Sequence, residues 1–330
     1  MRGVSQKSQY VYSTLESRSS SAMATPDRAS LAGRTLVVAT DGSQEARAAT
    51  AVASVLGRRR RASVVALRAY DYSATHDRAE VLVAPWGRSY DVLDFARQLL
   101  RQDLKRDVAE VETWNVRAVA GRPAHAIAAE ARALNAALVV MGLSRARAGF
   151  GDPRHDVVTQ VMRESSAPVL VTTGALAGAP RRIVVGVDLG LESVRVALAA
   201  LAVLDDDGEL VLAHVQGDSP QGGRLQRHAS SLAVESAASA LERLRRALPA
   251  RTNVTLEILR EPGDVATSLL AAAVRTRADC VAVGARPRAL DDGARLGAVA
   301  TALVNSGMRS LLAVPAVHRV TASAYTGHPS

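Results

Sequence analysis

The sequence predicts an α/β protein made of two tandem open-sheet domains, each a mostly five-stranded parallel sheet with helices on both faces. Short apolar runs of roughly four to eight residues alternate with longer Ala-rich stretches, the pattern of strands joined by crossover helices. Apolar residues make up 48% of the chain and aromatic residues only 3%, so the cores must consist of Ala, Val and Leu. Small-residue cores of this kind suit parallel strands covered by helices.

An internal repeat sets the number of domains. One apolar run ends in Asp41 and a second ends in Asp188. Three further pairs share one offset of 142 residues: Gly121 with Gly263, Gly142 with Gly284, and Pro168 with Ser310. A constant offset over such a stretch indicates a tandem duplication, and 330 residues suffice for two domains with a core each.

In the first half, the apolar runs predict strands over residues 36–40, 63–69, 113–119, 138–141 and 169–172. The stretches between them predict helices over residues 43–56, 92–109, 123–134 and 156–163. Ser43 and Asp156 open two of these helices, and both are favoured N-cap residues.

The second half repeats this order. Its predicted strands cover residues 183–187, 209–215, 254–259, 281–283 and 311–314. Its predicted helices cover residues 192–203, 225–248, 264–275 and 298–305. We therefore expect a first domain over 34–173, a small-residue flexible linker over 174–180 and a second domain over 181–316.

The two ends are expected to be disordered, as a leader over residues 1–33 and a tail over 317–330. The Ser-rich leader carries basic residues and no continuous apolar stretch, so neither a secretory signal nor a membrane span is expected, and Met23 is an alternative start. Cys280 is the only cysteine, which excludes an intrachain disulfide and a thiolate metal site. These features favour a cytoplasmic protein.

Charge and histidine patterns give little sign of further chemistry. The net charge is +9, and the densest basic run, residues 57–61, predicts a solvated helix end. Nucleic-acid binding is the alternative for this run, but no stacking aromatics or helix-turn-helix signal accompany it. The seven histidines lack metal-ligand spacing, and residues 205–208 predict a turn rather than a cation loop. No catalytic arrangement is recognised.

Ligands of open parallel sheets bind beyond the carboxyl ends of the strands. In each half, the turns after the first and fourth strands qualify. Asp41 and Asp188 lie in the first of these turns, and Gly142 and Gly284 begin the other. A turn with a helix N-cap would explain Asp41-Gly-Ser equally well, but the aspartate recurs at the same point in both halves.

With its 121–127 segment Gly-Arg-Pro-Ala-His-Ala-Ile, the Val-Val-Met-Gly142 run and the Ala-Pro-Val-Leu-Val171 close, the chain resembles the universal stress protein family in its tandem form. The resemblance covers about residues 34–173 and 181–315. It implies HUP or Rossmann-like domains of flavodoxin-like strand order that pair through their last strands.

Members that bind ATP carry a glycine pattern after the fourth strand, ending in Gly and Ser or Thr at a helix N-terminus that attracts phosphate. In the first half, the positions of this pattern are occupied by Gly142, Arg145, His155 and Asp156, so only the first of its three glycines is present. In the second half it meets Gly284, Pro287, Gly297 and Ala298, so two glycines remain. Asp156 would repel phosphate, although Arg145 could offset it, whereas Pro287 would stiffen the second loop.

By this resemblance, Asp188 would lie near the ribose, Val215 would offer backbone to adenine, and the glycines would face the phosphates. The residues expected to bind nucleotide in the second domain are Val187, Asp188, Val215, Gly284, Arg286, Gly297, Ala298 and Val299. Those in the first domain are Asp41, Ala69, Gly142 and Arg145.

These observations favour a non-catalytic regulator of the universal stress response that binds ATP, with Mg, or a related adenine nucleotide, more readily in the second domain. The alternative is a nucleotide-free scaffold that acts through protein contacts. Weak ATP hydrolysis is a third hypothesis, with Asp41 or Asp188 as the only candidate base. The expected partners are the nucleotide and either a second copy or a regulatory protein, with no specific nucleic acid and no membrane.

Overall fold

The structure, a computed structural model, describes residues 30–71, 92–143, 157–190, 192–216, 224–250, 252–259, 263–285 and 296–316, without the side chains of 224–234. Its first half contains β1 (Thr35–Ala39), α2 (Gln44–Arg60), β2 (Ser63–Tyr70), α3 (Val92–Lys105), η3 (Val111–Thr113), β3 (Asn115–Ala120), α4 (Pro123–Ala133), β4 (Leu138–Gly142), α5 (Val157–Glu164) and β5 (Val169–Thr172). Its second half contains β6 (Arg182–Gly186), α6 (Glu192–Val203), β7 (Glu209–Val215), α7 (Arg224–Arg246), β8 (Asn253–Leu259), α8 (Val265–Arg275), β9 (Cys280–Gly284), α9 (Ala298–Ser306) and β10 (Ser310–Val314).

Each predicted strand and helix is present, most bounds agree within two residues, and the largest differences are at the ends of α2 and α3. Helix α2 continues past the predicted end at residue 56 as far as Arg60, because the arginine run stays helical until Arg61 turns into the left-handed region at φ 53°. Helix α3 ends at Lys105 instead of 109, and turns follow it. The third strand begins at Asn115 because η3 occupies its predicted start.

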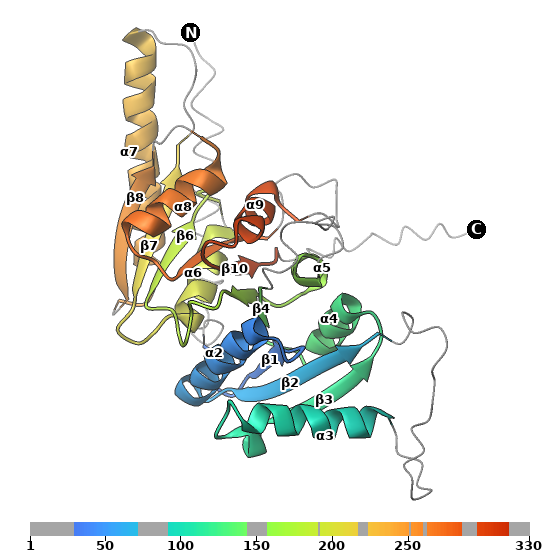
Figure 1. Ribbon diagram of the computed structural model, residues 1–330. Helices are drawn as coiled ribbons and strands as arrows, with labels where there is room; N and C mark the ends of the chain where they lie inside the picture. The colour runs from blue at the N-terminus through green and yellow to red at the C-terminus, as the bar shows by residue number, and fades with distance from the viewer. Residues whose placement is uncertain are drawn as a thin grey trace, which may run out of the picture.

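The ten strands form one sheet in the order β3-β2-β1-β4-β5-β10-β9-β6-β7-β8 (Figure 1). Each half therefore has the order 3-2-1-4-5, which confirms the α/β class and is the Rossmann-like order. It differs from the flavodoxin-like order, in which the third strand would lie next to the first. Hydrophobic periodicity marks strands but does not specify their neighbours, so the sequence pattern alone could not separate the two orders.

The two halves join through their last strands, as predicted from the resemblance. β5 and β10 pair antiparallel, with Leu170 opposite Leu312, whereas every other strand pair of this sheet is parallel. At the end of this ladder, the buried Ser310 hydroxyl accepts a hydrogen bond from the Thr173 amide at 3.1 Å. A continuous sheet thus crosses the domain boundary.

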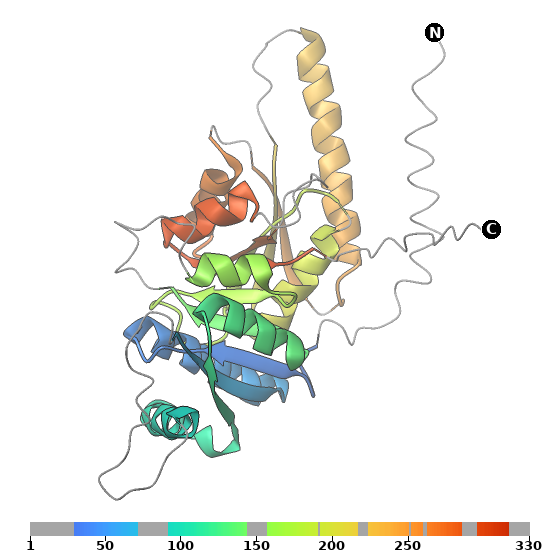
Figure 2. The same cartoon turned by 90° about the vertical axis from the view of Figure 1, so that its right-hand side faces the viewer.

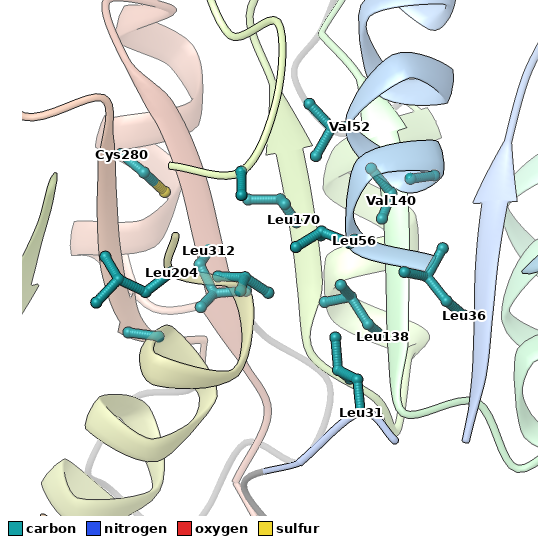
Figure 3. Close-up of a cluster of buried hydrophobic side chains, with 14 of the residues drawn as sticks. Leu31, Leu36, Val52, Leu56, Leu138, Val140, Leu170, Leu204, Cys280 and Leu312 are labelled. Carbon is teal, nitrogen blue, oxygen red and sulfur yellow. The ribbon is translucent and has the colours of Figure 1, made fainter. Parts of the chain in front are cut away.

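Both faces of the sheet carry a hydrophobic layer that extends over both halves. Helices α2, α3, α6 and α7 cover one face, and α4, α5, α8 and α9 cover the other (Figures 1 and 2). Leu56, Leu170, Leu204 and Leu312 meet in the first layer near the domain junction (Figure 3). Full burial of one such side chain contributes about 1.5–3 kcal/mol, so this junction is a major source of stability.

The linker packs into the same layer. Leu176 and Ala179 are buried in it, and the Pro180 carbonyl accepts a hydrogen bond from the Asp205 amide at 2.7 Å. The small residues that predict a flexible joint instead let the chain pass closely over the junction.

The arginine run lies at the largely exposed end of α2, as its charge predicts, and it also contacts the other domain. Arg59 binds Asp205, and Arg60 Nη1 lies 2.8 Å from Asp206 Oδ1 in the turn of the other domain. Arg60 also donates to the Leu204 carbonyl. The predicted turn at 205–208 is confirmed by a hydrogen bond from the Gly208 amide to the Asp205 carbonyl. Two separate sequence features thus form one contact between the domains.

Cys280 is fully buried, and this burial raises the pKa of its thiol far above the usual range. The thiol is therefore inert, as its apolar surroundings predict. Among the helices of the described part of the chain, none combines the length and apolar character needed to cross a membrane.

Candidate functional site

The strand order reverses at the same place in each half. β1 lies between β2 and β4, and β6 lies between β7 and β9. In open parallel sheets, the crevice beyond the carboxyl ends at such a reversal is the usual ligand site. Asp41 with Gly142, and Asp188 with Gly284, follow or end the strands that border these crevices. The structure therefore places each predicted pair at the expected edge.

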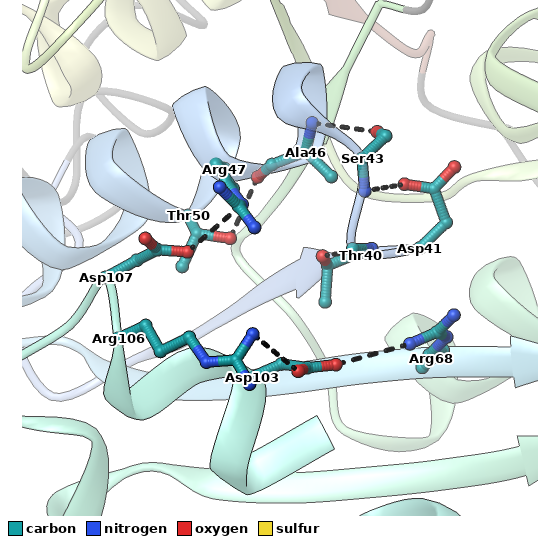
Figure 4. Close-up of polar contacts among 11 residues, drawn as sticks. Thr40, Asp41, Ser43, Ala46, Arg47, Thr50, Arg68, Asp103, Arg106 and Asp107 are labelled. Atoms are coloured by element: carbon teal, nitrogen blue, oxygen red, sulfur yellow. Dashed lines mark hydrogen bonds and ion pairs between the residues drawn. The ribbon is translucent and has the colours of Figure 1, made fainter. Parts of the chain in front are cut away.

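In the first domain, the turn after β1 is fixed by its own side chains (Figure 4). The Asp41 carboxylate accepts a hydrogen bond from the Ser43 amide at 2.9 Å, and the Thr40 hydroxyl accepts one from the Gly42 amide at 3.2 Å. The Ser43 hydroxyl accepts from the Ala46 amide, so Ser43 is the N-cap of α2. Asp41 therefore stabilises the turn in the absence of a ligand.

Arg68 at the end of β2 adds positive charge to this turn. Burial raises the pKa of Asp41, but the hydrogen bonds from Ser43 and the Arg68 charge outweigh burial and hold the pKa below its usual range. Asp41 is therefore a carboxylate at neutral pH, which makes it a poor general acid and a weak base. Ala69, the expected adenine contact, is half-buried next to Arg68.

Gly142 is packed directly against the first turn of α2. A Cβ at Gly142 would stand 2.4 Å from the Glu45 carbonyl and 2.7 Å from the Ala46 nitrogen. Glycine is required here so that β4 can end beneath the helix, which is a packing role rather than a phosphate contact. The first-domain crevice is therefore narrow at the end of β4.

In the second domain, Asp188 organises the corresponding turn in a different way. Its carboxylate accepts hydrogen bonds from the Gly190 amide and from the Ser193 hydroxyl, both at 2.9 Å. The Asp188 amide donates back to the Ser193 oxygen at 3.2 Å, and Ser193 is buried. Leu189 between them has φ 61°, so the turn is held in a conformation that costs energy for a leucine.

Gly284 stands in open space, unlike Gly142. Among the described residues, no atom would lie within 4 Å of a Cβ built on Gly284, and the residue is exposed. The next residue, Ala285, accepts a hydrogen bond from the Gly297 amide at 2.8 Å, which brings the start of α9 beside the end of β9. The two glycines that the second half retains thus lie together.

Helix α9 begins without a side-chain cap. Gly297 is its N-cap, and its first turn holds no acidic residue. The amides of Ala298, Val299 and Ala300 have no partner within the helix, because the first turn of any α-helix lacks acceptors for them. Such an end attracts anions through its amides and its dipole.

His214 lies beside the predicted base contact. Its Nδ1 is 3.0 Å from the carbonyl oxygen of Val187, which follows β6. Since a carbonyl only accepts, this nitrogen carries the proton. Val187 is buried, and Val215 is half-buried at the end of β7. Asp188, Val187 and Val215 therefore all lie at one edge of the sheet.

The remaining predicted residues divide into two groups. Gly297, Ala298 and Val299 join Gly284 at the open side of the second crevice. Arg145, His155 and Asp156 of the first half, and Arg286 and Pro287 of the second, lie outside the described residues.

The sequence pattern did not identify Ser193 or Arg68 as site residues, because a serine inside a helix and an arginine inside a strand give no distinctive pattern. The spacing from Asp188 to Ser193 could have suggested a turn contact. Arg68 could have been noticed as the residue before the expected base contact.

Two hollows of the described residues lie elsewhere. One, of about 380 Å³, lies between α3 and β3, and the other, of about 310 Å³, is lined by Arg182, Glu209 and the end of α8. No group of metal-ligating side chains occurs among the described residues. Neither hollow touches the predicted site, so the candidate site rests on the open Gly284 and the start of α9.

The universal stress protein family model matches residues 33–173 and, a second time, residues 180–315. Among solved structures, a universal stress protein from Archaeoglobus fulgidus DSM 4304 aligns with a TM-score of 0.52 at 14% identity, over 87% of this chain and 98% of its own. A Pseudomonas aeruginosa UCBPP-PA14 structure, described as that of a universal stress protein, gives 0.54 at 16% identity over 86% and 94%. These similarities show the fold.

A universal stress protein solved in complex with cAMP aligns with 43% of this chain and 97% of its own, at 23% identity and a TM-score of 0.33. No curated protein matches the chain.

Proposed function

Since the chain belongs to the universal stress protein family, we propose that it is a non-catalytic, cytoplasmic regulator of the stress response that binds ATP or a related adenine nucleotide in its second domain. The observation that carries the proposal is the pairing of an open Gly284 with an uncapped α9 N-terminus. This arrangement leaves backbone amides for an anion where the sheet order reverses.

The residues present fit a nucleotide in outline. Ala298 and Val299 would receive phosphate through their amides, and Gly284 leaves room for backbone approach. Asp188, held by Ser193 and Gly190, would lie on the ribose side. Mg would accompany the phosphates and neutralise part of their charge.

A nucleotide-free scaffold is the second candidate, and the packed Gly142 of the first domain favours it for that half. In that case the first domain serves the second as a structural partner through β5 and β10. The two candidates differ in whether the purified chain binds nucleotide at all.

The test is isothermal titration of Mg-ATP into the full chain and into Ala298→Asp. A carboxylate in the first turn of α9 favours the helix but repels phosphate, so we expect affinity to fall about tenfold or more with unchanged thermal stability. Ala302→Asp places the same charge on an exposed position further along α9 and serves as the control. Equal affinity in all three proteins would refute the assigned site, and absence of binding would favour the scaffold.

A further inference from the structure

Arg68 lies on β2 at the edge of the first-domain crevice. Ala39 of β1 pairs with Leu67 of β2, and the Thr40 amide donates to the Leu67 carbonyl at 2.9 Å. The next residue along β2, Arg68, therefore lies opposite the start of the turn that holds Asp41. Figure 4 shows its side chain beside Asp41, with its guanidinium directed towards Asp103.

Two contacts hold the guanidinium near the turn. Arg68 Nη1 lies 3.9 Å from Asp103 Oδ2, and Cζ lies 5.4 Å from the centre of the Tyr70 ring. A Cβ placed on Gly42 would be 3.6 Å from Nη1, so the guanidinium lies next to the position that a side chain at residue 42 would take. The side chain is only 29% exposed. It therefore occupies space in front of Gly42.

The second domain differs at this position. Gly186 of β6 pairs with Ala213 of β7, so His214 lies opposite Val187 as Arg68 lies opposite Thr40. The imidazole is shorter than an arginine side chain, and its Nδ1 is tied to the Val187 carbonyl at 3.0 Å. The two domains, alike in fold and strand order, thus carry different side chains at the same place in the crevice.

We propose that Arg68 closes the first-domain crevice to the nucleoside part of an adenine nucleotide, and so determines which of the two domains can be occupied. The proposal rests on nucleotide binding by the second domain. A ribose approaching Asp41 would have to displace the guanidinium from Asp103 and Tyr70. Each of these contacts is weak alone, but together they amount to about tenfold in affinity or more.

Equilibrium dialysis with radiolabelled AMP tests this inference in full-length protein. AMP is the probe because it presents the nucleoside part to the crevice together with only one phosphate. The background variant is Asp188→Ala, which weakens the second-domain site, and Arg68→Ala is added to it. The control adds Arg101→Ala, since Arg101 is a partly exposed arginine of α3 whose ion pair with Glu112 lies outside the crevice.

We expect Arg68→Ala to raise AMP affinity about tenfold or more over the Asp188→Ala background, while Arg101→Ala leaves it unchanged. An equal affinity in the background and in the Arg68→Ala protein, with both folded by thermal unfolding, would overturn the inference. Arg68→Lys in the same background keeps a long cation, so its affinity should stay close to that of the background. If it binds as tightly as Arg68→Ala, the inference is also overturned.

Failure of the proposed function is distinguishable. If wild-type protein binds neither Mg-ATP nor AMP, the second-domain assignment fails. The comparison of Asp188→Ala with and without Arg68→Ala still decides whether Arg68 closes the first crevice, because only that comparison reports on the first domain.

Discussion

The backbone of Gly142 lies against that of Glu45, so closely that a Cβ on Gly142 would stand 2.4 Å from the Glu45 carbonyl oxygen. At the repeat-related Gly284, the part of the chain that the structure describes places no atom within 4 Å of the same point. The two equivalent glycines therefore have different roles: Gly142 permits close packing of β4 against α2, whereas Gly284 leaves space beside the end of β9.

Substitution of these glycines by alanine should separate the two roles. Gly142→Ala forces a shift between β4 and α2, and such overpacking costs about 1–3 kcal/mol in the free energy of unfolding. Gly284→Ala should leave that free energy nearly unchanged and lower nucleotide affinity instead. Chemical denaturation and titration of both variants check this. Equal destabilisation by the two substitutions would show that Gly284 is also packed.

The ion pair of Arg60 with Asp206 should connect the two domains weakly. Their side chains are 26% and 63% exposed, so the coupling energy in a double-mutant cycle should be about 0.2–1 kcal/mol and should fall as salt rises. Arg60→Ala costs more than Asp206→Ala, because Arg60 also donates to the Leu204 carbonyl. A cycle measured by denaturation at low and high salt provides the numbers, and coupling that does not respond to salt would contradict this account.

Asp205 should make the domain contact sensitive to acid. Burial raises its pKa, but the hydrogen bond and charge of Arg59 outweigh burial and lower the pKa below its usual range. A carboxylate with a lowered folded-state pKa stabilises the fold above its unfolded pKa of about 4, and this stability is lost as the pH falls through the folded-state value.

We therefore expect Asp205→Asn to lower Tm at neutral pH and to match wild type at low pH. Thermal unfolding between about pH 7 and about pH 3 tests this, with the exposed neighbour Asp207→Asn as control. Parallel curves for wild type and Asp205→Asn over that whole range would show that the ion pair does not contribute.

The domain junction should unfold together with the rest of the sheet. Leu170 and Leu312 are fully buried and lie opposite each other across the β5–β10 ladder. Leu170→Ala should cost about 2–5 kcal/mol in the free energy of unfolding. Since the hydrophobic layer crosses the boundary, calorimetry should show one cooperative transition in the variant and in wild type. Two separate transitions in wild type would mean that the halves fold independently.

Much of this fold could be predicted from the sequence, because the periodicity and the length of the apolar runs indicate buried strands and crossover helices. The tandem repeat predicted two halves of five strands each, which the structure joins into one ten-stranded sheet, and the glycines at 142 and 284 end β4 and β9 at the expected edge. Strand order, by contrast, is fixed by how helices pass over the sheet, which local patterning does not contain.

The aspartates and glycines of the candidate site lie at the edge of the sheet where the sequence places them, and nucleotide binding at that edge stays a prediction. The arginine run and the aspartate turn each looked like surface features, because the contact of Arg60 with Asp206 joins residues far apart in the chain. Likewise, the difference between Gly142 and Gly284 depends on how closely a neighbouring helix approaches, which no residue type reveals.

The most direct test of the second-domain site is the number of ATP molecules bound per chain, measured by titration in wild type, Asp188→Ala and Asp41→Ala. We expect one site per chain, an affinity about tenfold or more weaker in Asp188→Ala, and an affinity in Asp41→Ala equal to wild type. Loss of binding in Asp41→Ala with Asp188→Ala unaffected, or no binding by the wild-type chain, would contradict the assignment of the nucleotide to the second domain.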